Sequence, residues 1–165
     1  MDNKNEFIEQ PTVPQTDNNF NSVVCDLKTV KILKRLLSGR ISEQTLFNTY
    51  LFQFLLNENN LELKNAILSL YEQKQKNINL LADAIISFGG VPRFTNGQGN
   101  FWSARYVNYI TNSRYYISNN IDKERLLIRE YQRAKSKTTN QTLINLYNQL
   151  INNSNFAISL LNKFI

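Results

Sequence analysis

The sequence contains no histidine, and this is its most restrictive feature. Histidine is the commonest metal ligand in proteins and the usual general base near neutral pH. The chain also has a single cysteine, Cys25. Zinc sites and catalysis by Cys/His or Ser/His pairs are therefore excluded in their ordinary forms, which leaves carboxylates, tyrosines and lysines for any chemistry.

Long apolar runs and sorting signals are also missing. No stretch approaches the roughly 18 uninterrupted apolar residues of a membrane span, so no membrane span is expected. Met1 is followed by Asp-Asn-Lys-Asn-Glu rather than by a basic and then apolar segment, and nothing marks the chain for secretion. A lone cysteine cannot form an internal disulfide, which is compatible with a reducing compartment. These features favour a cytoplasmic protein.

Positive charge is in moderate excess. The chain has 19 Lys and Arg against 13 Asp and Glu, a formal net charge of +6. Such a charge permits nucleic acid as a partner but does not require it, and no recognised binding motif accompanies it. The densest basic group lies opposite apolar residues of the first helix, as on the solvated side of an amphipathic helix: Lys28, Lys31, Lys34 and Arg35. We expect no nucleic-acid partner, although a basic DNA-binding protein remains an alternative.

The length of 165 residues predicts one domain with a single core. Residues 1–22 contain Pro11, Pro14 and many Asn, Asp and Gln residues without hydrophobic periodicity. This composition predicts a disordered or loosely attached N-terminal arm. The folded domain then comprises residues 23–165.

Four segments have apolar residues at alternating steps of three and four, which predicts helices. The first spans residues 26–54, and either Gly39 kinks it or Ser42 caps a new helix. The second spans residues 61–88 and ends at Gly89, Gly90 and Pro92. The third and fourth are predicted over residues 121–137 and 143–164.

The second and third helices are joined by a long aromatic connection, residues 91–120. A structureless loop of this length is uncommon in a compact domain, so we expect it to pack along the helices and to contain short helical turns. Four helices with short links in each half and one long connection between the halves predict an all-α four-helix bundle with a crossover between helices 2 and 3.

Polar residues interrupt the apolar stripes at matching depths. Lys74 and Asn77 stand in the middle of the stripe of the second helix, where an unpaired polar group costs several kcal/mol. The corresponding places on the other helices hold Glu43, Glu124, Ser154 and Ala157. We expect these six residues to meet in one layer.

These six residues follow the ligand arrangement of the di-iron and di-manganese carboxylate proteins. In those proteins, helices 1 and 3 each supply one metal ligand, and helices 2 and 4 each supply a pair of ligands at positions i and i+3. The sequence also resembles ferritin-like proteins of spore-forming bacteria that are related to rubrerythrin and bacterioferritin. Four stretches carry the resemblance: Ser42 and Glu43 followed by Tyr50, residues 80–92, residues 101–109, and residues 121–131. The resemblance implies a ferritin-like bundle, self-association into a homo-oligomer, and a role in spores or the spore coat.

The resemblance also implies which residues occupy the ligand positions. Glu43 and Glu124 match the single carboxylate ligands of helices 1 and 3. The Glu and His positions of helix 2 are occupied by Lys74 and Asn77, and those of helix 4 by Ser154 and Ala157. A shifted register that uses Glu72 and Gln75 is an alternative, but Glu72 lies about 200° around the helix from Lys74.

These substitutions predict a polar cluster in place of a metal site. Two buried carboxylates would repel each other without metal, and Lys74 supplies a cation between Glu43 and Glu124. Tyr50, Tyr131 or Asn77 would satisfy the remaining hydrogen bonds, and the small Ser154 and Ala157 would leave room for the lysine. The leading hypothesis is a non-catalytic structural or interaction protein without a cofactor.

Three other interpretations remain. The layer could have decayed and filled with water, or the chain could retain iron or manganese at Glu43 and Glu124 with oxidase or peroxide-detoxifying activity. Catalysis by a buried lysine is the third, since burial can depress a lysine pKa.

Overall fold

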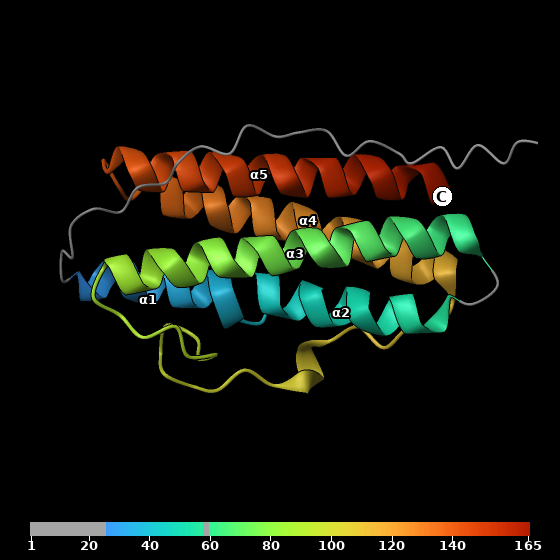
Figure 1. Cartoon of the computed structure of the whole chain (residues 1–165), viewed down its shortest axis with the longest axis horizontal. Helices are drawn as coiled ribbons and strands as arrows, with labels where there is room; N and C mark the ends of the chain where they lie inside the picture. The colour runs from blue at the N-terminus through green and yellow to red at the C-terminus, as the bar shows by residue number, and fades with distance from the viewer. Residues whose placement is uncertain (1–25, 58–59) are drawn as a thin grey trace, which may run out of the picture.

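The computed structural model describes residues 26–57 and 60–165, so the predicted arm at residues 1–22 lies outside the described residues. The described part is helical, with one isolated β-bridge between Thr95 and Phe101. Its helices are α1 (Leu27–Ser38), α2 (Glu43–Leu56), α3 (Leu61–Ser87), η1 (Ala104–Tyr106), α4 (Ser113–Lys135), α5 (Gln141–Leu161) and η2 (Asn162–Phe164). Figure 1 shows α1 and α2 end to end beside α3, so the described helices form the predicted all-α four-helix bundle.

The break between α1 and α2 lies at residues 39–42, where the sequence allows either a kink at Gly39 or a new helix capped by Ser42. The N–H of Gly39 donates to the carbonyl of Arg35 and closes α1. Ser42 has an extended backbone, and its Oγ accepts a hydrogen bond from the N–H of Thr45 at 3.2 Å. Ser42 is therefore the N-cap of a new helix, as serine often is, because its side chain satisfies an otherwise unpaired N–H.

The predicted second helix is confirmed as α3. Asn60 caps its start, where its side chain accepts from the N–H of Leu63 at 3.0 Å. The helix ends at Ser87, followed by Gly89 with φ +76. That backbone conformation is in the left-handed region, which glycine adopts without steric cost.

The crossover is shorter than the sequence predicts. Asn112 caps α4, which begins at Ser113, so the predicted start near residue 121 is wrong by about two turns. The missed turns contain Tyr116 and Ile117, both buried in the core. Aromatic and β-branched residues are weak helix formers, so this part of α4 depends on tertiary packing more than on local propensity.

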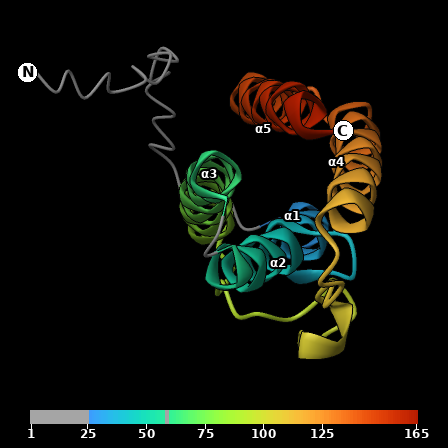
Figure 2. The same cartoon turned by 90° about the vertical axis from the view of Figure 1, so that its right-hand side faces the viewer.

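The crossover packs along the outside of α1 and α2, as Figures 1 and 2 show. Three hydroxyl side chains of these helices hold it. Ser38 Oγ donates to the carbonyl of Thr95 at 2.8 Å, Thr45 Oγ1 accepts from Trp102 Nε1 at 3.0 Å, and Thr49 Oγ1 accepts from the N–H of Asn108 at 3.2 Å. The connection thus packs along the helices, as predicted, and η1 is its short helical turn; the helices that it covers are α1 and α2.

The basic face of α1 points to solvent. Lys28, Lys31 and Arg35 are exposed and Lys34 is half-buried, whereas Val30 and Leu33 are buried in the core. These basic residues therefore form the polar side of an amphipathic helix. Within the described ranges, no helix combines the length and apolar character needed to cross a membrane.

Candidate functional site

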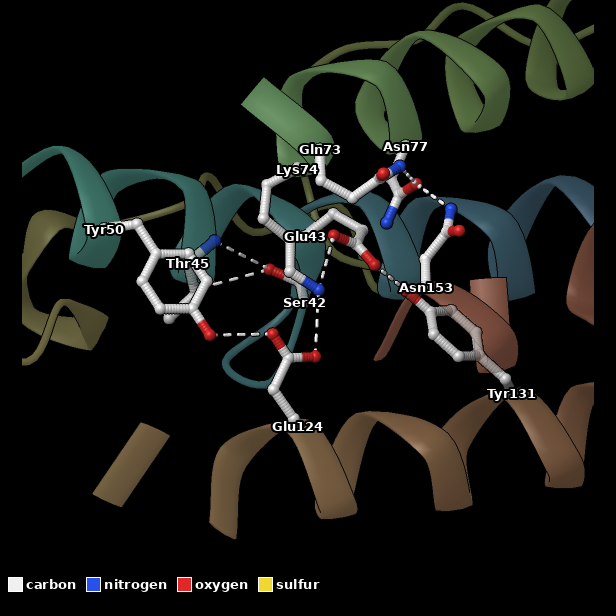
Figure 3. A network of polar contacts seen from close by, with 10 residues as sticks. All are labelled: Ser42, Glu43, Thr45, Tyr50, Gln73, Lys74, Asn77, Glu124, Tyr131 and Asn153. Atoms are coloured by element: carbon white, nitrogen blue, oxygen red, sulfur yellow. Dashed lines mark hydrogen bonds and ion pairs between the residues drawn. The ribbon is translucent and has the colours of Figure 1, made fainter. Parts of the chain in front are cut away.

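Lys74 lies at the centre of the bundle with 1% of its surface exposed. Its Nζ donates to Glu124 Oε2 at 2.9 Å and lies 3.2 Å from Glu43 Oε2, as Figure 3 shows. The carboxylates come from α4 and α2, so this cluster joins three helices. A buried charge without a partner is strongly destabilising, and the two carboxylates are the facing groups that Lys74 requires.

Two buried tyrosines donate hydrogen bonds to the carboxylates. Tyr50 OH of α2 donates to Glu124 Oε1 of α4 at 2.8 Å. Tyr131 OH of α4 donates to Glu43 Oε1 of α2, so the two pairs are reciprocal. Each carboxylate therefore has one oxygen facing the ammonium and the other accepting from a phenol. We call these five residues the Glu–Lys–Glu cluster.

Polar pairs continue from the cluster along the α2–α4 interface. Asn120 Nδ2 donates to Gln53 Oε1 at 2.7 Å, and Asn57 Nδ2 donates to Tyr116 OH at 2.7 Å. Residue numbers rise along α2 as they fall along α4, as antiparallel helices require. We call the following four pairs the polar seam: Glu43–Tyr131, Tyr50–Glu124, Gln53–Asn120 and Asn57–Tyr116.

Two residues of the polar seam, Gln53 and Asn120, are not among those predicted from the sequence. Both are fully buried. Their spacing held a signal, because Gln53 is three residues after Tyr50 and Asn120 is four residues before Glu124. Each thus lies one helical turn from a cluster residue on the same face.

The other residues of the predicted layer are Asn77 on α3 and Ser154 and Ala157 on α5. Asn77 makes no hydrogen bond to either carboxylate among the described contacts, so of the three side chains expected to complete the cluster only the tyrosines do so. Asn77 Oδ1 instead accepts from Gln73 Nε2 at 3.2 Å and Asn153 Nδ2 at 2.8 Å. Ser154 and Ala157 are buried on α5.

The alternative register with Glu72 and Gln75 is not supported by their burial. Gln75 is exposed and Glu72 is only half-buried, whereas Lys74 between them is buried. The side chains of Glu72 and Gln75 therefore point away from the direction of Lys74, as the angles between these positions on a helix predict.

Burial and the neighbouring charges both shift the pKa values of the cluster residues. Burial raises the pKa of Glu43, and the opposing effect of Lys74 does not restore it, because Glu124 is a like charge nearby. Burial would lower the pKa of Lys74, but the two carboxylates together raise it. Burial and the carboxylates hold the pKa of Tyr50 and of Tyr131 well above the usual value of tyrosine. The lysine is therefore an ammonium, and the tyrosines are neutral donors.

This donor set does not fit a di-metal centre. Such centres in four-helix bundles use four carboxylates and two histidines, and here two carboxylates remain around an ammonium. Within residues 26–57 and 60–165, no three carboxylate, thiolate or imidazole side chains are grouped so that they could hold a metal ion. The arrangement is suited to holding three helices together by charge and hydrogen bonds.

Comparisons with known proteins identify the fold. No protein-family model matches the chain, and no curated sequence matches it. The structure is similar to KatB, a manganese catalase from Anabaena PCC7120, with a TM-score of 0.76 and 17% identity over 95% of this chain and 80% of that chain. A second structure, of wild-type KatB, has a TM-score of 0.73 at the same identity and coverage.

A dodecameric thioferritin, the bacterioferritin-related protein from Bacteroides fragilis, has a TM-score of 0.67 and 17% identity over 84% of each chain. Similarity at this level of identity shows a shared fold. The chain therefore has a ferritin-like helical bundle.

Proposed function

We propose that this chain is a non-catalytic ferritin-like protein with a structural or interaction role. In this proposal the Glu–Lys–Glu cluster stands in place of a di-metal centre. One observation carries the proposal: Lys74 Nζ lies 2.9 Å from Glu124 Oε2 and 3.2 Å from Glu43 Oε2.

The ammonium and a metal ion would compete for the same oxygens. A divalent cation among these carboxylates would stand within a few ångströms of the Lys74 ammonium, where like charges repel strongly at low dielectric. The lysine would have to leave a position where it is 1% exposed. The layer also lacks the imidazole ligands that favour iron and manganese in such bundles, because the chain has no histidine.

A metal-dependent peroxide-handling or oxidase activity is the second candidate. The structural similarity to a manganese catalase favours it. It requires Lys74 to swing away and two metal ions to bind with Glu43 and Glu124 as the only carboxylate ligands of the layer.

Metal content and peroxide turnover separate the two candidates. The full chain is purified from cells grown with added iron and manganese, and its metal is measured by mass spectrometry alongside oxygen release from hydrogen peroxide. We expect well below one metal ion per chain. We also expect oxygen release from hydrogen peroxide to be no faster than with the same amount of free metal and no protein. Two ions per chain with metal-dependent oxygen release would establish the second candidate.

Self-association and a spore location complete the proposal. The dodecameric state belongs to the thioferritin, and the spore association comes from the sequence resemblance. A homo-oligomer would elute above the 19.3 kDa of one chain with the corresponding mass by light scattering. Detection of the chain in washed spores and not in growing cells would support the spore role, and the reverse distribution would contradict it.

A further inference from the structure

Three buried polar atoms at the centre of the bundle have no hydrogen-bond partner among the described residues. They are Glu43 Oε2, Asn77 Nδ2 and Ser154 Oγ, on α2, α3 and α5. All three residues are fully buried. Buried polar groups in folded proteins nearly always bond to protein or to ordered water, so each of these atoms needs an explanation.

The hydrogen bonds of Asn77 determine which end of its amide is free. Its Oδ1 accepts from both Gln73 Nε2 and Asn153 Nδ2. With Gln73 and Asn153 presenting their nitrogens, a flipped Asn77 amide would set its own nitrogen against two donors, so in this network Nδ2 is the end without a partner.

The two carboxylates of the cluster differ in the hydrogen bonds that they accept. Glu124 accepts hydrogen bonds at both oxygens, from Tyr50 and from Lys74. Glu43 accepts one from Tyr131, while its Oε2 has only the ion pair with Lys74 at 3.2 Å. Glu43 Oε2 therefore retains the capacity to accept a hydrogen bond.

Two of the three atoms belong to residues of α3 and α5, which contact each other. Asn77 is one turn beyond Lys74 on α3, and Asn153, which donates to it, is next to Ser154 in the chain. Figure 3 shows Asn77 and Asn153 on the side of Glu43 that is away from Tyr50. Ser154 and Ala157, which are small residues of the same helix as Asn153, are buried.

We infer that this side of the cluster is an internal binding site for one water molecule. Asn77 Nδ2 offers a donor, Glu43 Oε2 an acceptor and Ser154 Oγ either, and water can donate two hydrogen bonds and accept two. Internal waters typically have about three such partners. The site makes Ser154 a ligand-binding residue and gives Glu43 Oε2 a donor besides the Lys74 ammonium, and it does not depend on the role proposed for the chain.

Nuclear magnetic resonance of the full, ¹⁵N-labelled chain tests the site directly. Water-selected NOE and ROE spectra report a long-lived water next to an amide proton. We expect a cross-peak of the through-space sign between water and the Asn77 side-chain amide. Asn120 is the matched control, because its Nδ2 is equally buried but donates to Gln53 Oε1 at 2.7 Å. An Asn77 amide as silent as that of Asn120 would overturn the inference.

Two variants at Ser154 add an independent test. Ser154→Val places a methyl group in the site and should remove the Asn77 cross-peak. Ser154→Ala should lower the urea midpoint, because the water loses one of its partners. A midpoint that rises on Ser154→Ala would show that the hydroxyl is unpaired and would also overturn the site. The wild-type spectrum decides the question if either variant fails to fold.

Discussion

Gln53 and Asn120 exchange two hydrogen bonds across the α2–α4 interface, at 2.7 Å from Asn120 Nδ2 and 3.4 Å from Gln53 Nε2. Both side chains are fully buried, one turn from the Glu–Lys–Glu cluster. The pair belongs to the polar seam and links the two halves of the bundle by two hydrogen bonds between buried amides.

We predict that Gln53→Leu lowers the free energy of unfolding by about 1–3 kcal/mol, because it leaves the amide of Asn120 buried without its partner. The double variant Gln53→Leu with Asn120→Leu should lose less than the sum of the single variants. Urea denaturation of all four proteins gives the coupling energy. Additive losses would mean that the pair does not act as a unit.

Lys74→Met should be strongly destabilising at neutral pH. Removal of the ammonium leaves Glu43 and Glu124 as facing buried acids, and breaking a buried ion pair in this way typically costs about 3–5 kcal/mol. The loss should shrink at acidic pH, because burial raises the pKa of the Glu43 carboxyl and its protonation removes one of the two facing charges. Urea denaturation at pH 4.5 and pH 7.5 measures both effects.

Lys76→Met is the control for Lys74→Met, because Lys76 is exposed on the same helix. It should change stability by no more than about 0.5 kcal/mol. Equal, small effects of the two variants at pH 7.5 would count against the cluster as a unit of structure.

Alkaline pH should destabilise the protein steeply. Burial raises the pKa of Tyr147 to about 12, and the pKa of Tyr50, of Tyr131 and of Lys74 also exceeds the ordinary value. The unfolded chain loses these protons at lower pH than the folded chain does. Stability is therefore fully present below about pH 10 and is lost as the pH rises through the folded-state values.

The slope of that loss should be about 1.4 kcal/mol per pH unit for each such group. Unfolding measured from pH 9 to 11.5 reports the slope, and tyrosinate absorbance reports the ionisation. Combined Tyr50→Phe and Tyr131→Phe substitutions should make the slope shallower, whereas Tyr115→Phe at the surface should not. A slope that is the same in all three proteins would contradict the role given to the buried phenols.

Restoring the ligand plan should create a metal site. The variant Lys74→Glu, Asn77→His, Ser154→Glu, Ala157→His supplies the two missing Glu and His pairs around Glu43 and Glu124. We expect it to bind two manganese or iron ions per chain. The variant with only the two α5 changes keeps Lys74 and should bind less than one ion. Equal binding by both would show that the lysine does not exclude metal.

The arrangement of the bundle is largely predictable from the sequence, because apolar residues at steps of three and four identify each helix. Lys74 is predictable as a central residue for the same reason, since it interrupts a regular stripe. The start of α4 is not, because Tyr116 and Ile117 are weak helix formers and are held by packing. The residue facing Asn77 is also not predictable, because Asn153 lies on another helix and next to the expected stripe rather than on it.

Diffraction from a crystal of the chain grown with manganese and iron, with anomalous data at both metal edges, would show whether an ammonium or a metal ion occupies the centre of the bundle. We expect the Lys74 side chain between Glu43 and Glu124 and no anomalous peak there. An anomalous peak between the two carboxylates, with Lys74 turned away, would contradict this expectation.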